Sequence, residues 1–188
     1  VTAGVTVAEG TTTKAVLTSL EALNNVCENG GEFTFAEDLT FSEILEITAK
    51  NPVIIDGNGK TITSSAGRAI NVSGANNVTI KNLNIVASGE RAINVIQNSK
   101  KVTIENVTAT AANYTVNVAS SAPGAVVAIK NSTLNGLCTV NVSSAGATVT
   151  VDGSTVNCND NNTTEGESYA ALSLNKEAVG GKIIATNS

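Results

Sequence analysis

The chain has 188 residues, of which 41% are hydrophobic but only 3% aromatic, and it contains no Trp, Met or His. A core without aromatic anchors is filled by Val, Ile, Leu and Ala, which suits thin repetitive layers. The net charge of −5 argues against nucleic acid or an anionic membrane as a partner. No apolar run approaches the roughly 20 residues of a membrane-spanning helix, so membrane insertion is not expected. Because histidine is absent, the commonest general base and metal ligand is missing.

Residues 1–32 are predicted to form an N-terminal segment with a capping helix over 11–25, ahead of a repetitive domain over 33–188. Thr12 or Thr13 is the expected N-cap of this helix. Its apolar face is formed by residues at helical spacing, namely Val16, Leu17, Leu20 and Leu23. The chain begins at Val1 without the features of a signal peptide, so we expect that any targeting segment has been removed.

Self-similarity is the strongest signal in the rest of the chain. One segment type reads VIIDG at 53–57, VTIKN at 78–82, VTIEN at 102–106, VAIKN at 127–131 and VTVDG at 149–153. A second type reads AINV at 69–72 and 92–95, TVNV at 115–118 and 139–142, and ALSL at 171–174. Both alternate apolar and small polar residues, as a strand with one buried face does. Since both types return every 22 to 25 residues before the last copy, they predict a solenoid whose strands pair in parallel with their counterparts one coil later.

Residues at equal phase of the repeat are compatible neighbours, which supports this register. One phase alternates in charge at every step, and we call it the charge column: Asp56, Lys81, Glu105, Lys130 and Asp152. The next phase, the turn column, holds only Gly and Asn: Gly57, Asn82, Asn106, Asn131 and Gly153. These residue types tolerate a left-handed backbone, so a tight turn is expected between two strands of each coil.

The turn column, together with VIIDGNGKTI at 53–62, resembles the pectate-lyase-like superfamily of parallel β-helices. The resemblance covers about residues 33 to 188 and implies an all-β fold, a right-handed parallel β-helix of about six coils with an N-terminal capping helix. It implies little about activity, because this superfamily includes lyases, hydrolases, adhesins, tailspikes and inert surface domains.

In the enzymes of that superfamily, the substrate cleft follows the outward face of the strands of the second type. Lyases there need carboxylates for calcium and a Lys or Arg as base, and hydrolases need clustered Asp residues. With Ile70 and Val72 pointing inward, the outward face instead presents a column of asparagines among small residues: Asn71, Asn94, Asn117 and Asn141. The expectation is therefore a non-catalytic face that binds a ligand through uncharged polar groups.

Two further groups are weaker candidates. Arg68 and Arg91 share a phase at the rim of this face and could engage a uronate or sulfate, although solvated turn residues with Glu90 as counter-ion are the plainer interpretation. Tyr114 and Tyr169 are the only tyrosines, and either could flank the asparagine face. An acidic insertion follows Cys158, and its carboxylates fit no defined calcium loop: Asp160, Glu165 and Glu167. No cofactor is expected, and calcium is the one alternative.

Two features of the ends stay open at this point. Cys138 and Cys158 lie on neighbouring coils and either form a disulfide or remain thiols. The stretch from Gly180 to Ile184 predicts a last strand with no visible cap behind it, so we expect a homodimer through this coil or a fragment of a longer protein.

The sequence as a whole predicts a non-catalytic secreted or cell-surface bacterial domain, with a glycan-binding, adhesive or purely structural role. The partner would be a polysaccharide or a host-surface glycan. The alternative is a polysaccharide lyase or glycoside hydrolase, or a degenerate relative, that acts on acidic polysaccharide.

Overall fold

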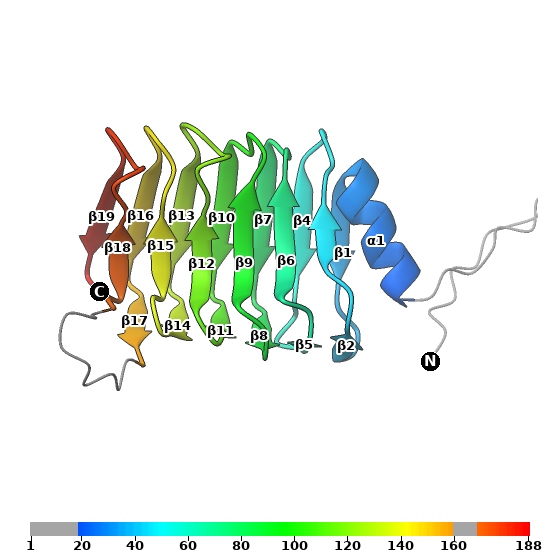
Figure 1. Cartoon of the computed structure of the whole chain (residues 1–188). Helices are drawn as coiled ribbons and strands as arrows, with labels where there is room; N and C mark the ends of the chain where they lie inside the picture. The colour runs from blue at the N-terminus through cyan, green and yellow to red at the C-terminus, as the bar shows by residue number, and fades with distance from the viewer. Residues whose placement is uncertain (1–18, 160–168) are drawn as a thin grey trace, which may run out of the picture.

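A computed structural model describes residues 19–159 and 169–188 and shows a parallel β-solenoid of about five turns with one short N-terminal helix (Figure 1). The strands pair in parallel along the length of the solenoid. The all-β parallel fold predicted from the repeat is therefore confirmed. The number of turns is about five rather than six, because the six strands of sheet B, and likewise those of sheet C, are joined by five complete turns of the chain.

Each turn contains three strands in a fixed order, one in each of three sheets. Sheet A consists of β1 (Gly31–Thr34), β4 (Val53–Asp56), β7 (Asn77–Lys81), β10 (Lys101–Glu105), β13 (Val126–Lys130), β16 (Thr148–Asp152) and β19 (Lys182–Thr186). Sheet B consists of β2 (Leu39–Phe41), β5 (Thr61–Ser64), β8 (Asn84–Ala87), β11 (Thr108–Thr110), β14 (Thr133–Gly136) and β17 (Thr155–Cys158). Sheet C consists of β3 (Leu45–Ile47), β6 (Arg68–Ser73), β9 (Arg91–Ile96), β12 (Tyr114–Val118), β15 (Val140–Val142) and β18 (Leu172–Leu174).

The register between coils is the one that the repeat predicts. Lys81 stands opposite Glu105, and Glu105 stands opposite Lys130, so the charge column consists of true neighbours. The first segment type forms sheet A and the second forms sheet C. The ALSL copy at 171–174 and the last expected strand appear as β18 and β19, paired with β15 and β16.

Sheet B was not predicted, although it leaves a signal in the sequence. Its strands are only three or four residues long, too short for a clear alternating pattern. They do recur directly after the turn column, and their second residue is apolar in β5, β8 and β14. The third strand of each coil was therefore visible as a weak repeat.

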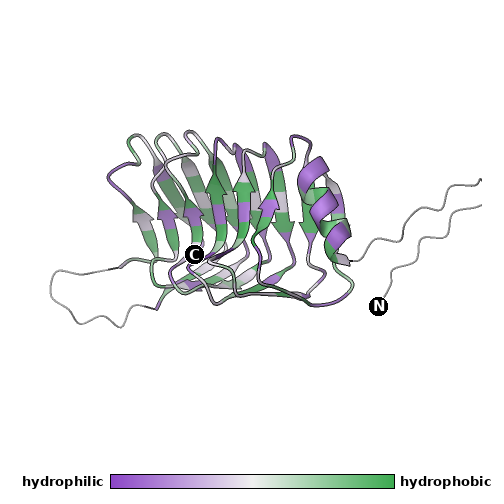
Figure 2. Cartoon of the chain, turned by 45° about the vertical axis from the view of Figure 1, so that its right-hand side comes forward, coloured by the Kyte–Doolittle hydropathy of each residue, from purple (hydrophilic) through white to green (hydrophobic). Residues whose placement is uncertain are grey.

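The core runs through the middle of the solenoid as stacked columns of aliphatic side chains. Ile55, Ile80, Ile104 and Ile129 form one such column in sheet A, and all are fully buried. Figure 2 shows hydrophobic and hydrophilic residues alternating along the strands. Because every coil buries the same kind of side chain on the coil below, aliphatic residues fill the interior, and Phe35 after β1 is the one fully buried aromatic residue in the described part of the chain.

The turn column adopts the left-handed backbone that its residue types favour. Positive φ angles occur at Asn82 (52°), Asn106 (52°), Asn131 (46°) and Gly153 (56°). The turn after β4 differs, because Asn58 (49°) and Gly59 take the positive φ angles there instead of Gly57. Gly57 is required for a different reason: a Cβ at this position would collide with the backbone of Asn82 and Leu83.

The capping helix is α1 (Ser19–Asn29), which packs on β1 and β3. The predicted end at residue 25 is wrong by one turn, because Val26 and Cys27 continue the apolar face of Leu23 and Cys27 is buried. Leu20 is 40% exposed and so contributes little to that face. Thr12, Thr13, Val16 and Leu17 lie outside the described residues. Within the described part of the chain, no helix is long and apolar enough to cross a membrane.

Candidate functional site: an asparagine ladder on sheet C

The asparagines of sheet C form one hydrogen-bonded ladder along the solenoid. Each side-chain Nδ2 donates to the Oδ1 of the asparagine one coil earlier. The distances are 2.9 Å from Asn94 to Asn71, 2.7 Å from Asn117 to Asn94, and 2.7 Å from Asn141 to Asn117. The parallel register holds these residues directly opposite one another, so equal phase in the sequence becomes contact in space.

The ladder is closed rather than open to solvent. Only 1% of Asn94 is exposed, and 4% of each of Asn71, Asn117 and Asn141. Sequence reasoning placed these four residues on one face, opposite Ile70 and Val72, and expected that face to be open. The structure brings the four together as expected, but their amides hydrogen-bond to one another and are shielded from solvent.

Two residues that the sequence reasoning missed end the ladder. At the N-terminal end, Asn71 Nδ2 donates to Glu46 Oε1 at 2.6 Å. At the other end, Asn175 Nδ2 donates to Asn141 Oδ1 at 3.0 Å and to Ser143 Oγ at 2.8 Å. Glu46 lies 25 residues before Asn71, which is the repeat distance, so its position was a usable signal. Asn175 was hidden by the insertion, and the residue in strand register with Asn141 is the shorter Ser173.

Glu46 also fixes the direction of every amide in the ladder. A carboxylate can only accept a hydrogen bond, so Asn71 must turn its Nδ2 toward Glu46 and its Oδ1 toward Asn94. The same constraint passes to each following asparagine. The ladder is therefore polar, with all donors directed toward the N-terminal end of the solenoid.

The predicted arginine pair forms a second cluster at the edge of sheet C. Arg68 stands opposite Arg91, and Arg91 stands opposite Tyr114 in the next coil. The Arg91 guanidinium lies 5.3 Å from the centre of the Tyr114 ring and 3.3 Å from Glu90 Oε1. The Nε atoms of both arginines are buried without a hydrogen-bond partner. Arg91 is thus in strand register with Arg68 and is paired with Glu90, the counter-ion that the sequence suggested.

Only one end of the charge column is a close ion pair in the described residues. Lys81 Nζ lies 3.2 Å from Asp56 Oδ2, while Asp56 Oδ1 accepts hydrogen bonds from the Asn58 backbone N–H and the Asn82 side-chain amide. Partial burial raises the pKa of Asp56, but these hydrogen bonds and Lys81 outweigh it, so the pKa is lowered overall. This column is a solvated face with a hydrogen-bonded carboxylate at each end, because Asp152 Oδ1 also accepts hydrogen bonds from Thr186 Oγ1 at 2.6 Å and from Asn187 Nδ2 at 3.1 Å.

The three cysteines are free. Cys158 Sγ donates to the Leu137 carbonyl oxygen at 3.0 Å, Cys138 is buried, and the two do not form the disulfide left open above. Burial, reinforced by the neighbouring Glu28 carboxylate, raises the pKa of the Cys27 thiol to about 12.

The candidate calcium ligands Asp160, Glu165 and Glu167 lie outside the described residues. Among the residues that are described, no group of three or more His, Cys, Asp or Glu side chains could hold a metal ion.

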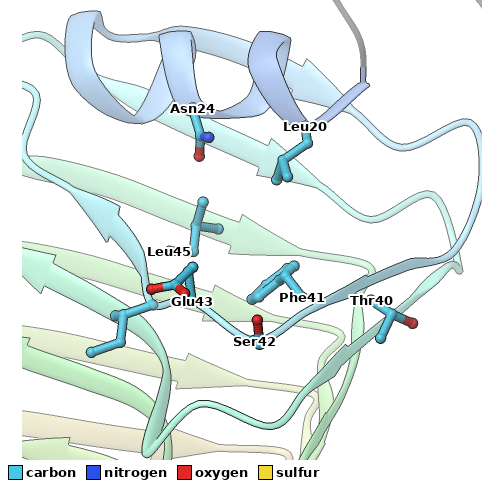
Figure 3. Close-up of a pocket in the computed structure, with 8 residues that line it drawn as sticks. Leu20, Asn24, Thr40, Phe41, Ser42, Glu43 and Leu45 are labelled. Atoms are coloured by element: carbon cyan, nitrogen blue, oxygen red, sulfur yellow. The ribbon is translucent and has the colours of Figure 1, made fainter.

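A cavity of about 370 Å³ lies between α1 and the link from β2 to β3 (Figure 3). Leu20, Phe41 and Leu45 supply its apolar lining, and Asn24, Ser42 and Glu43 supply polar groups. Sequence reasoning did not find it, because it arises where the helix meets the first coil and not from the repeat. It lies at the opposite end of sheet C from Asn175.

The fold and the ladder together define the chain as a parallel β-solenoid with a hydrogen-bonded asparagine column. No protein-family model matches the chain, and comparison with curated proteins and with solved structures gives no match.

Proposed function

We propose that the chain is a non-catalytic structural module of a secreted or cell-surface protein, built on a β-helix of the pectate-lyase-like type. The observation that supports this proposal is the closed ladder. An asparagine that binds a ligand must offer its amide to that ligand, whereas these amides are shielded and donate to one another. A continuous ladder instead stiffens the stack, because each hydrogen bond between side-chain amides favours the same register in the next coil.

The experiment that tests this role compares ladder variants in stability and in binding. Replacing Asn94 by Ala is expected to lower the stability of the protein and to leave any glycan-array signal unchanged. Uronate lyase assays, with and without added calcium, address catalysis in the same preparations. Formation of an unsaturated uronate product would overturn the non-catalytic proposal. A glycan signal that disappears in Asn94→Ala at a temperature where the variant is folded would overturn the structural one.

A second candidate is weak binding of an acidic glycan at the Arg68–Arg91–Tyr114 cluster, which the register of these residues favours. Two stacked guanidinium groups can hold a carboxylate or sulfate by paired hydrogen bonds, and a tyrosine ring beside them offers an apolar surface to a sugar. The test measures binding to polyuronate and to sulfated polysaccharide as a function of salt. Arg68→Ala should weaken it, while the control Lys101→Ala, an exposed cation on sheet A, should not. Equal loss in both variants would show only non-specific attraction.

A further inference from the structure

Sheet A runs the whole length of the solenoid, from β1 to β19, and among the described residues its outer face is open to solvent (Figure 1). Burial alternates along its strands, so every second side chain points away from the core and is partly or fully exposed. Val126 on this face is 48% exposed. The charge column runs along one side of the face. A second column of outward side chains, which we call the middle column, lies two residues earlier on each strand: Ile54, Thr79, Thr103, Ala128 and Thr150.

The charge column is complementary to its own reverse. From Asp56 to Asp152 its charges are negative, positive, negative, positive and negative. A second copy, related by a two-fold rotation about an axis parallel to the strands, presents the same face with the coil order reversed and the strand direction unchanged. The two charge columns then lie against each other, because both are at the same end of the strands. With the axis between β7 and β10, Lys81 faces Glu105 of the other copy. Asp56 likewise faces Lys130, and the rotation repeats both pairs.

The middle column fits in the same register. Thr79 faces Thr103 of the other copy, so hydroxyl meets hydroxyl. Ile54 faces Ala128, so apolar group meets apolar group. Uncharged side chains thus form the centre of the contact and the ion pairs lie at its rim, which is the usual arrangement at protein interfaces.

The area of this contact is small but sufficient for a weak dimer. The overlap extends from β1 to β16 in each copy and ends with Asp152 opposite Thr34, an uncharged residue. Strands about 4.8 Å apart with a rise of about 3.3 Å per residue give about 500 Å² on each copy, or about 1,000 Å² in total. That area is near the lower limit for a specific interface. The ion pairs at the rim determine the orientation of the two copies more than their affinity.

Other arrangements of the same face fit less well. A register shifted by one coil sets Lys81 against Lys81 or Glu105 against Glu105. A rotation about the long axis of the solenoid sets the charge column against the opposite ends of the strands, where only Glu105 meets an unlike charge, in Lys101. A shift by two coils opposes unlike charges again, but it sets the exposed Val126 against Lys101 and would desolvate this cation without a partner.

We propose that sheet A is the interface of a homodimer, in which a second copy of this chain packs face to face with reversed coil order and with Lys81 opposite Glu105. Two solenoids are then held side by side with their long axes antiparallel. This inference rests on charge complementarity and strand register and is independent of the proposed function.

The test measures the oligomeric state of the full chain by sedimentation equilibrium at protein concentrations up to about 1 mM. Lys81→Glu opposes carboxylate to carboxylate in the proposed contact, and Glu105→Lys opposes cation to cation. The matched controls make the same changes of charge off sheet A, in the turn after β18: Lys176→Glu and Glu177→Lys. Circular dichroism verifies that each variant is folded. The neutral pair Lys81→Gln and Lys176→Gln repeats the comparison with a milder change, and only the first of these should weaken the dimer, by about twofold or more.

The two reversals are then mixed in equal amounts. In the mixed dimer the introduced carboxylate faces the introduced cation, and the native Glu105 of one copy faces the native Lys81 of the other. Every facing pair is therefore again opposite in charge. Each variant alone should weaken dimerisation by about tenfold or more, whereas the mixture should recover the wild-type dissociation constant to within about threefold.

A wild-type chain that remains monomeric at about 1 mM would overturn the proposal. A dimer that neither reversal weakens would also overturn it, because its contact would lie elsewhere, for example at the C-terminal coil. Loss of the dimer in each variant without recovery in the mixture would contradict the pairing of Lys81 with Glu105.

Discussion

Removal of one interior ladder residue, in Asn117→Ala, is expected to destabilise the protein by about 3 to 5 kcal/mol. Asn117 donates to Asn94 and accepts from Asn141, both at 2.7 Å, so the change deletes two hydrogen bonds. A typical net contribution is about 1 kcal/mol for each bond. The Oδ1 of Asn94 also loses its donor while only 1% of that residue is exposed, and an unsatisfied buried group costs about 1 to 3 kcal/mol more. Asn141 is partly compensated, because Ser143 Oγ lies 3.4 Å from its Nδ2.

The end of the ladder supplies the matched control. Asn175 is exposed, so Asn175→Ala opens its neighbour to water rather than leaving it unsatisfied. We expect this change to cost only about 0.5 to 1 kcal/mol. The two variants thus remove the same type of side chain and two hydrogen bonds each, and they differ in how deeply the removed residue is buried.

Urea unfolding measures both variants, with circular dichroism as the probe. The midpoints can be compared only if the slope of the unfolding free energy against urea concentration is the same in both variants. A second spectroscopic probe tests whether unfolding is a single transition, because stacked repeats unfold in parts more readily than compact domains. Equal midpoints for Asn117→Ala and Asn175→Ala would refute the reasoning. They would show that the interior side-chain hydrogen bonds contribute no more to the free energy of unfolding than those at the surface.

Three further predictions follow from single groups. The folded state lowers the pKa of Asp56 below the unfolded value of about 3.9, so its contribution to stability is complete above that pH and is lost as the pH falls through the folded pKa; urea midpoints against pH should be flatter for Asp56→Asn, and an unchanged profile would contradict the assignment. In the native protein a thiol-reactive disulfide reagent should label the partly exposed Cys158 and should label Cys27, 1% exposed with its pKa raised to about 12, only on unfolding; rapid labelling of Cys27 would speak against its burial. Gly89→Ala should cost about 1 to 3 kcal/mol, because its Cβ would collide with a backbone carbonyl of the previous coil, whereas Gly67→Ala finds open space and should be neutral in the same unfolding assay.

The sequence predicts most of the coil because, in a solenoid, the repeat distance in the sequence is the separation between strand partners on successive coils. Lys81 and Glu105 are neighbours for the same reason that they are 24 residues apart. The features that were missed depend on something other than period. The helix end at Asn29 is set by packing of Val26 and Cys27 on the first coil, and the short sheet B strands carry too few residues to show an alternation.

The candidate site shows where the same reasoning stops. Alternation places Asn94 opposite Ile93 on its strand, but alternation cannot tell an open face from a shielded one. Exposure depends on what the neighbouring columns and turns cover, and that is a property of the assembled coil. Of the two end groups, Asn175 is hidden from the pattern because it follows an insertion, whereas Glu46 lies one repeat before Asn71 and was missed because it is a different residue type.

The hydrogen-bond inventory of an asparagine column separates a ligand-binding face from a structural one. A side-chain amide has two N–H donors and one acceptor oxygen. Within the ladder, Asn117 donates one N–H to Asn94 and accepts at its oxygen from Asn141. Its second N–H has little access to a ligand, because only 4% of the residue is exposed. A sugar hydroxyl could bind there only by breaking bonds of the ladder, and it would then replace two aligned hydrogen bonds with interactions of similar strength. Binding at this column would therefore gain little, and any polysaccharide that this protein contacts should be held by side chains outside the ladder, where Arg68 and Arg91 are the charged pair already in register.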